Sequence, residues 1–287
     1  MSMILVLATG ASLAHKSAGP QVPTDPNLLV RTVIDNELKI NEQDHTHWMY
    51  RTQRQEGEKS TVKEVVETRA CDVDVLVSTN DQPLTAEQRQ KENQRLQKLV
   101  SDPEEQRKKM KESQEDDQKA TAMFKMLPDA FLYRYSSRNR SLVKLTFSPN
   151  PHFLPPSREA QVFHGMEGTM TIDAEKKRLV ALDGHLAQDV EFFGGLIGHL
   201  NKGGRFSVQR AEVASGHWET TLISVQMNGK AIIFKTISLQ QNDSMTQFRR
   251  VPEDLTPSQA AEILSKQGLA GGREAAVVTG APGKGGN

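Results

Sequence analysis

The stretch GTMTIDAEKKRLVALDGHL, residues 168–186, carries the pattern that decides the fold of this 287-residue chain. Met170 and Ile172 alternate with polar threonines, residues 173–176 are typical of a turn, and alternation resumes after them. A period of two is the pattern of a β-strand that buries one face. The stretch therefore predicts two antiparallel strands joined by a tight turn.

The same pattern extends to both sides of this hairpin. Alternating segments cover residues 134–250, and Asn228-Gly229 is typical of a two-residue hairpin turn between two of them. The predicted strands at 218–227 and 231–239 are apolar on both faces. A sheet with water on one face alternates cleanly, so both faces of these strands must be covered. Sheet curling with ordinary core packing is one interpretation, and an apolar ligand cavity is the other.

One segment inside this region breaks the alternation. The sequence FFGGLIGHL, residues 192–200, places large apolar side chains around three glycines in what should be a connection between strands. Apolar residues in a connection need either the core or a bound apolar partner to cover them. With nearby aromatic residues they form the predicted hydrophobic ligand-binding set, which is Phe192, Phe193, Leu196, Ile197, Leu200, Phe206, Trp218 and Phe234. The predicted hinge of this lid consists of Gly194, Gly195 and Gly198.

An amphipathic helix and three strands are expected before the meander. Asp25-Pro26 is typical of an N-cap followed by the first helical residue, and apolar residues at helical spacing follow it. Alternating residues within 47–78 then predict three short strands. The helix needs an apolar surface, and the sheet can supply one.

A charged helical insertion is expected at residues 85–127. Thr85 and Gln88 have the spacing of a capping box, and the segment 104–119 is polar on every side apart from Met110. A helix of this kind is typically a solvated surface element. An arm that binds a protein partner is the alternative interpretation.

The two ends of the chain differ from the region between them. Residues 1–14 resemble a signal peptide, with a short apolar run before the small-x-small pattern of residues 12–14. No other stretch approaches the roughly 18 apolar residues of a membrane span. Residues 270–287 are rich in glycine and alanine and are predicted to be disordered. We therefore expect a soluble, exported, periplasmic protein with a single domain over residues 25–267.

Charge and reactive residues argue against several classes of protein. The formal net charge is zero, so attraction to nucleic acid is not predicted. Cys71 is the single cysteine, which excludes an intrachain disulfide and favours a buried thiol. His45 and His47 share one side of a predicted strand without a third ligand, and no nucleophile elbow or dinucleotide fingerprint is present. The sequence therefore predicts a protein without catalytic residues, metal or cofactor.

Several of these segments together resemble the outer-membrane lipoprotein carrier and lipoprotein-sorting family. They are the hairpin at 168–186, the segment FFGGLIGHLNKGGRF at 192–206 and the strand that carries Trp218. The hairpin turn after Ile172 is similar to that family's Trp-Ile-Asp turn, with Thr171 where tryptophan or another large residue is often found. The resemblance implies an α+β fold: a strongly curved antiparallel sheet, or incomplete barrel, with helices packed on it or closing it.

The resemblance also implies an apolar cavity that accepts lipid acyl chains. The predicted function is a non-enzymatic periplasmic protein of outer-membrane biogenesis that binds a hydrophobic ligand, either an acyl chain or a lipoprotein, with peripheral or transient membrane contact at most. The alternative is a structural or envelope-stress interaction protein without a small-molecule ligand. In that alternative, the curved sheet is filled by its own side chains and the charged helix docks an envelope protein.

Overall fold

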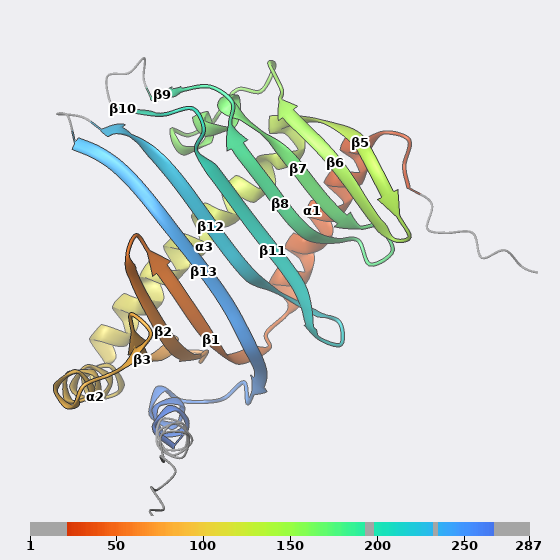
Figure 1. The fold of residues 1–287 in the computed structure, drawn as a ribbon. Coiled ribbons are helices and arrows are strands. Elements are labelled where there is room, and N and C mark those ends of the chain that lie inside the picture. Colours follow the sequence, from red (N-terminus) through yellow and green to blue (C-terminus); the bar gives the residue numbers. More distant parts are fainter. Residues whose placement is uncertain (1–21, 193–197, 232–234, 267–287) are drawn as a thin grey trace, which may run out of the picture.

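A computed structural model describes residues 22–192, 198–231 and 235–266 of the chain. The protein contains one large antiparallel sheet of 13 strands, and its long helices lie on one face of that sheet (Figure 1). The sheet is not closed into a barrel. This architecture confirms the predicted α+β class with an open, barrel-like antiparallel sheet.

The predicted meander forms most of the sheet. Its strands lie side by side in the order in which they occur in the chain, and only β9 and β10 leave this path, as a small hairpin attached to β12. The strands are β5 (Phe131–Asn139), β6 (Leu142–Pro149), β7 (Met166–Asp173), β8 (Arg178–Leu186), β9 (Val190–Phe192), β10 (Gly198–Leu200), β11 (Arg205–Ala214), β12 (His217–Ala231) and β13 (Lys235–Val251).

The first strands of the chain extend the sheet beyond its last strand. β1 pairs antiparallel with β13, so the N-terminal strands lie at the opposite edge from β5. They are β1 (His47–Glu56), β2 (Lys59–Val66), β3 (Val73–Thr79) and β4 (Gln82–Pro83). The three predicted N-terminal strands are confirmed, and β4 is a two-residue addition to them.

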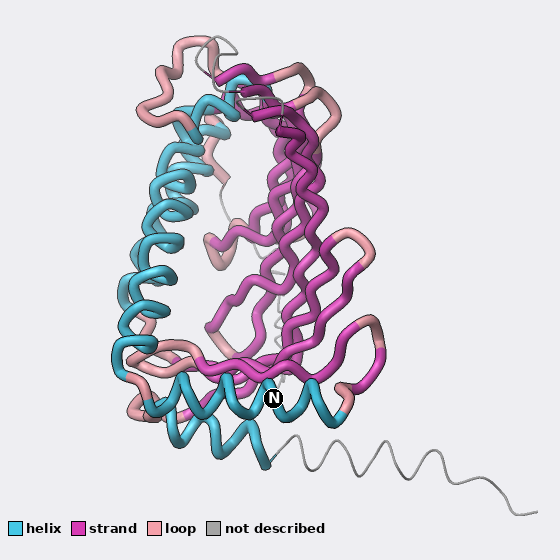
Figure 2. The backbone as a smooth tube through the Cα atoms, turned by 90° about the vertical axis from the view of Figure 1, so that its left-hand side faces the viewer, coloured by secondary structure: helices cyan, strands magenta, loops and turns pink. Residues whose placement is uncertain are grey.

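Three helices pack against the sheet, two of them on one face and the other across its end near β3 (Figure 2). They are α1 (Pro26–Gln43), α2 (Ala86–Ser101) and α3 (Pro103–Ala130). The predicted caps are present: the Asp25 carboxylate accepts the N–H of Asn27 at 2.9 Å, and Thr85 and Gln88 form the capping box of α2. α3 continues past Pro128 to Ala130. A 3-10 helix, η1 (Glu159–Gly165), and a helical segment at 257–266 complete the described part.

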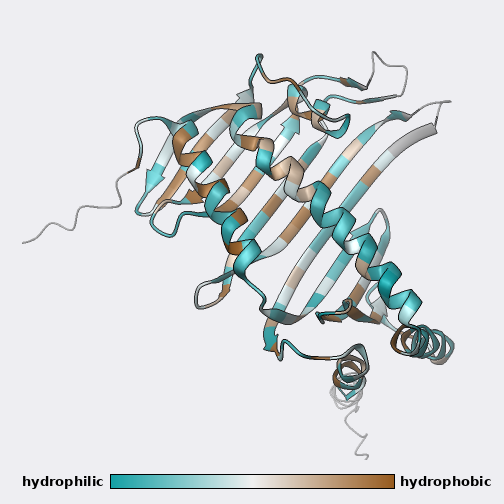
Figure 3. Ribbon diagram, turned by 180° about the vertical axis from the view of Figure 1, so that it is seen from behind, coloured by the Kyte–Doolittle hydropathy of each residue, from teal (hydrophilic) through white to brown (hydrophobic). Residues whose placement is uncertain are grey.

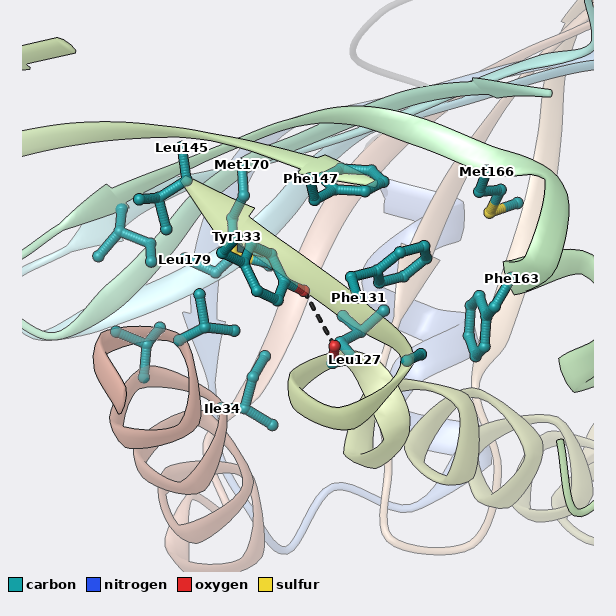
Figure 4. Packing of buried hydrophobic residues seen from close by; sticks show 14 of the residues in the cluster. Ile34, Leu127, Phe131, Tyr133, Leu145, Phe147, Phe163, Met166, Met170 and Leu179 are labelled. Carbon is teal, nitrogen blue, oxygen red and sulfur yellow. Dashed lines mark hydrogen bonds between the residues drawn. The ribbon is translucent and has the colours of Figure 1, made fainter. Parts of the chain in front are cut away.

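The main core lies between α1, the end of α3, and strands β5–β8 (Figure 4). Phe131 is at its centre, with its ring centroid 4.7 Å from that of Phe147 and 5.3 Å from that of Phe163. The Tyr133 hydroxyl donates to the carbonyl oxygen of Leu127 at 3.0 Å, which satisfies the one polar atom of that ring. This part of the helix-covered face is filled by the protein's own side chains.

A second core cluster lies at the other edge of the sheet. Met49 and Val66 pack there with Leu96 of α2 and Leu264 of the C-terminal helical segment. The thiol of Cys71 is buried in the same cluster, as the sequence predicted. The C-terminal segment thus covers the apolar side of the strands that are farthest from the main core.

The charged helix α3 is tied to the sheet by one acidic side chain. The Asp74 carboxylate accepts hydrogen bonds from Lys109 of α3 at 2.5 Å and from Lys63 of β2 at 2.9 Å. Burial acts to raise the pKa of Asp74, but the two ammonium groups outweigh it and hold the pKa well below its usual range. Most of the 104–119 segment is otherwise exposed or half-buried, in agreement with the predicted solvated face.

The hairpin predicted at Asn228-Gly229 is wrong. Both residues lie inside β12, and Gly229 pairs with Ile237 in the middle of the β12–β13 ladder. The chain instead reverses between Ala231 and Lys235, and β13 is one long strand where two were predicted. Glycine is needed at 229 because its antiparallel neighbour β10 lies very close to it: a Cβ there would lie 2.2 Å from the carbonyl oxygen of His199.

This close approach gives a prediction for Gly229→Ala. The added methyl group must push β10 away from β12, and we expect a loss of about 1–3 kcal/mol in the free energy of unfolding. Urea unfolding followed by circular dichroism measures it. Asn228→Ala, at an exposed position of the same strand, is the matched control and should cost less than about 0.5 kcal/mol. Equal stability of the two variants would contradict the close approach of β10 to Gly229.

Candidate functional site

A cavity of about 530 Å³ lies between the helices and the central strands. Its walls come from α1, α3, β1, β8, β11 and β12, so segments far apart in the sequence meet there. Figure 3 shows the helices crossing this face of the sheet. The apolar part of the lining consists of Leu38, Ile40, Trp48, Phe124, Leu179, Val208 and Trp218.

The cavity lies beside a point where two neighbouring strands separate. The pairing of β12 with β13 ends at Leu222 and Ser244; beyond it β13 continues beside β1, and β12 continues beside β11 (Figure 1). Trp48 bridges the two strands, because its ring lies 5.7 Å from that of His217 on β12 and 6.1 Å from that of Phe248 on β13. We call this place the β12–β13 split.

A buried ion cluster forms one part of the cavity wall. The Glu37 carboxylate of α1 accepts from Arg178 Nε at 2.9 Å, from the N–H of Leu179 at 2.7 Å, and from Arg210 Nη1. Arg210 also donates to the carbonyl oxygen of Trp218 at 2.7 Å. The side chains of Glu37 and Arg178 are only 4% and 5% exposed. The cluster therefore fixes α1 to β8 and β11 through a buried carboxylate–guanidinium pair and the partly exposed Arg210.

Two carboxyl groups elsewhere in the wall have no cation bonded to them. Among the described residues, neither Glu67 nor Glu219 forms an ion pair within 4.0 Å. Burial raises the pKa of Glu67 to about 8, and neighbouring carboxylates add to the shift, although the N–H of Trp48 donates to Glu67 at 2.8 Å. Burial also raises the pKa of Glu219, against the opposing effect of Arg210.

The raised pKa of Glu67 predicts a stability that depends on pH. The folded protein keeps a proton on Glu67 up to about pH 8, whereas the unfolded chain releases it near the ordinary value of 4.5. The contribution to stability is therefore complete below pH 4.5 and is lost as the pH rises to about 8. We expect Glu67→Gln to flatten this decline in urea unfolding measured across that range. Glu58→Gln, at an exposed turn, should keep the wild-type slope, and parallel slopes for both variants would contradict the assignment.

The structure separates the residues of the predicted ligand-binding set. Trp218 lines the cavity, but Leu200 and Phe206 pack against the main core farther along the sheet. Phe192 ends β9 and Gly198 begins β10, so the two ends of the predicted lid pair with each other. The remaining predicted residues lie outside the described part: Phe193, Gly194, Gly195, Leu196, Ile197 and Phe234.

A wider polar hollow of about 930 Å³ lies on the helix-free face of the sheet. Glu167, Asp183, His185 and Arg205 line it together with serine and threonine side chains. The Ser207 hydroxyl donates to the Asp183 carboxylate at 2.6 Å. These residues alternate with the apolar ones of the other face, as expected for the solvated face of an antiparallel sheet.

The sequence interpretation missed the charged part of the cavity. Glu37 occupies the same helical stripe as Val33 and Ile34, which are buried and lie four and three residues before it. An acidic residue on the apolar face of a helix was the available signal for a buried ion cluster. Arg210 and Glu219 carried no such signal, because only the sheet register brings them to the cavity.

No protein-family model, curated protein or solved structure matches the chain. Over residues 22–192, 198–231 and 235–266, no helix has both the length and the apolar character needed to cross a bilayer. Within those same ranges, no three His, Cys, Asp or Glu side chains are grouped in a way that would hold a metal ion. Function must therefore be argued from the cavity.

Proposed function

We propose that this chain is a non-enzymatic, periplasmic binding protein that holds the acyl chain of a lipid or lipoprotein in the cavity between its helices and its curved sheet. The observation that carries the proposal is the cavity itself. Its volume lies within the roughly 300–1,000 Å³ typical of ligand pockets, and aromatic and aliphatic side chains form much of its wall.

The mechanism is burial of apolar ligand surface. Each methylene group that leaves water contributes about 0.8 kcal/mol, so a chain of several methylenes can be held without a covalent or catalytic step. Trp48, Trp218 and Phe124 offer flat apolar surfaces for such a chain. Trp48 and Trp218 lie beside the β12–β13 split.

A cavity-filling substitution tests the proposal. Ala120 and Ala122 are both exposed positions of α3, but only Ala120 lines the cavity. Titration with an uncharged fluorescent probe, a pyrene-labelled monoacylglycerol, should show binding to the wild type and a loss of at least about tenfold in Ala120→Phe. Ala122→Phe should bind the probe as the wild type does.

Two further results bear on the same proposal. Organic extraction of the purified protein followed by mass spectrometry should release a lipid in a stoichiometric amount. If no lipid is released and the probe does not bind, the proposed function is wrong.

A structural or envelope-stress interaction protein is the second candidate, and one observation favours it. The half of the sheet under α1 is filled by the protein's own side chains, with Leu145, Met170 and Ile172 fully buried. In this candidate, the exposed charged face of α3 docks an envelope protein. Cross-linking in cell envelopes should then capture one stoichiometric partner through α3, and the Ala120→Phe substitution should leave that partner unchanged.

A further inference from the structure

The charges that line the cavity are unbalanced. Five carboxyl groups and two guanidinium groups reach it, and the two guanidinium groups, those of Arg178 and Arg210, are both bonded to one carboxylate, Glu37. The remaining carboxyl groups come from four separate places in the fold: Asp44 after α1, Glu67 after β2, Asp117 on α3 and Glu219 on β12.

In the described part of the chain, one of these four carboxyl groups lies within 4.0 Å of a side chain that can carry a positive charge. Asp44 lies 3.0 Å from the ring of His217 and accepts the N–H of Thr46 at 2.9 Å. Among the described residues, no lysine or arginine lies within 4.0 Å of Glu67, Glu219 or Asp117. The cavity therefore holds carboxyl groups that the protein itself does not bond to a lysine or arginine, and Glu67, with its pKa of about 8, carries its charge only above that pH.

Two of these carboxyl groups are held in position beside an aromatic ring. Glu67 accepts the backbone N–H of Trp48 at 2.8 Å, and Glu219 lines the same cavity as the Trp48 ring. Carboxylates attract an organic cation through their charge. The ring of Trp48 already has the Arg250 guanidinium 5.7 Å from its centroid, so the attraction for a ligand comes from the carboxylates. The last turn of α1, which ends beside them, carries no basic residue, so the negative end of its dipole is not compensated either.

We propose that the cavity selects ligands whose apolar chain carries a cationic ammonium head, and that Glu67 and Glu219 determine this specificity. The inference rests on the proposed function, because it names the head group of the ligand that the apolar wall would hold. An anionic head would bring a further negative charge to an acidic site, where like charges repel. An uncharged head would gain neither attraction nor repulsion.

Three ligands with the same chain test the selection: dodecylammonium, dodecanol and dodecanoate, each titrated calorimetrically below its micellar concentration at about pH 9, above the pKa of Glu67. We expect dodecylammonium to bind at least about tenfold more tightly than dodecanol, and dodecanoate to bind more weakly than both. In Glu67→Gln/Glu219→Gln the first two ligands should bind within about twofold of each other, with the affinity for dodecanol unchanged. Both substitutions remove carboxyl groups whose ionisation burial opposes, so the variant should fold.

The control is Glu167→Gln, which removes one charge from the helix-free face and should leave the order of affinities unchanged. Dodecanoate binding as tightly as dodecylammonium would overturn the inference while leaving the proposed function intact, since the chain would still be held. A double variant that keeps the wild-type preference would also overturn the inference alone. Failure of all three ligands to bind would overturn the proposed function and the inference together.

Discussion

Replacement of Glu37 by leucine is expected to lower the free energy of unfolding by about 3–5 kcal/mol. The substitution leaves the Arg178 guanidinium, which is only 5% exposed, without its carboxylate partner. The N–H of Leu179 loses its acceptor at the same time. Equilibrium urea unfolding monitored by circular dichroism measures the loss.

Two matched variants show whether the buried charge is the cause. Asp129→Ala breaks the Arg31–Asp129 pair, whose side chains are 50% and 61% exposed, and should cost less than about 1 kcal/mol. Addition of Arg178→Met to the Glu37→Leu variant removes the unpaired guanidinium and should recover part of the lost free energy of unfolding. A Glu37→Leu protein as stable as the wild type would show that water enters the cluster and that the packing described for it is wrong.

Replacement of Phe131 by alanine is the second large effect, with an expected loss of about 3–5 kcal/mol. Phe131 is 2% exposed, and its ring is in contact with the rings of Tyr133, Phe147 and Phe163, so truncation leaves a space that rigid neighbours cannot close. Thermal and urea unfolding should both show this loss in the free energy of unfolding. Leu132→Ala is the control, because the neighbouring side chain points to the other face of β5 and is 46% exposed; we expect it to stay within about 0.5 kcal/mol of the wild type.

Local patterns in the sequence predicted most of the helices and strands, but they could not predict which distant strands pair with each other. The alternation around Met170 and Ile172 predicted β7 and β8, and Asp25 and Thr85 predicted the starts of two helices, because these signals are contained within a few residues. The pairing of β1 with β13 joins segments about two hundred residues apart and left no local trace. The hairpin turn predicted at Asn228-Gly229 was wrong because glycine occurs where two backbones approach closely as well as in turns.

The candidate site was predictable only in part. Trp218, one of the predicted ligand-binding residues, lines the cavity, and its role in binding stays a prediction. Phe206 was grouped with it by composition alone, and the register places Phe206 opposite Val225, far along β12 from Trp218. In the sequence, acidic residues such as Glu67 and Glu219 are indistinguishable from ordinary surface residues. Only the fold brings them to the same cavity.

The β12–β13 split has a consequence for how the protein opens. The main core lies on one side of it and the second cluster on the other, and the strand ladder that joins them runs only from Ala231 to Leu222. Cooperative opening units tend to follow such divisions. We expect amide hydrogen exchange to resolve two such units, with β5–β8 exchanging at the slower rate and β1–β3 at the faster, so that the cavity wall around Trp48 opens at a free-energy cost below that of global unfolding.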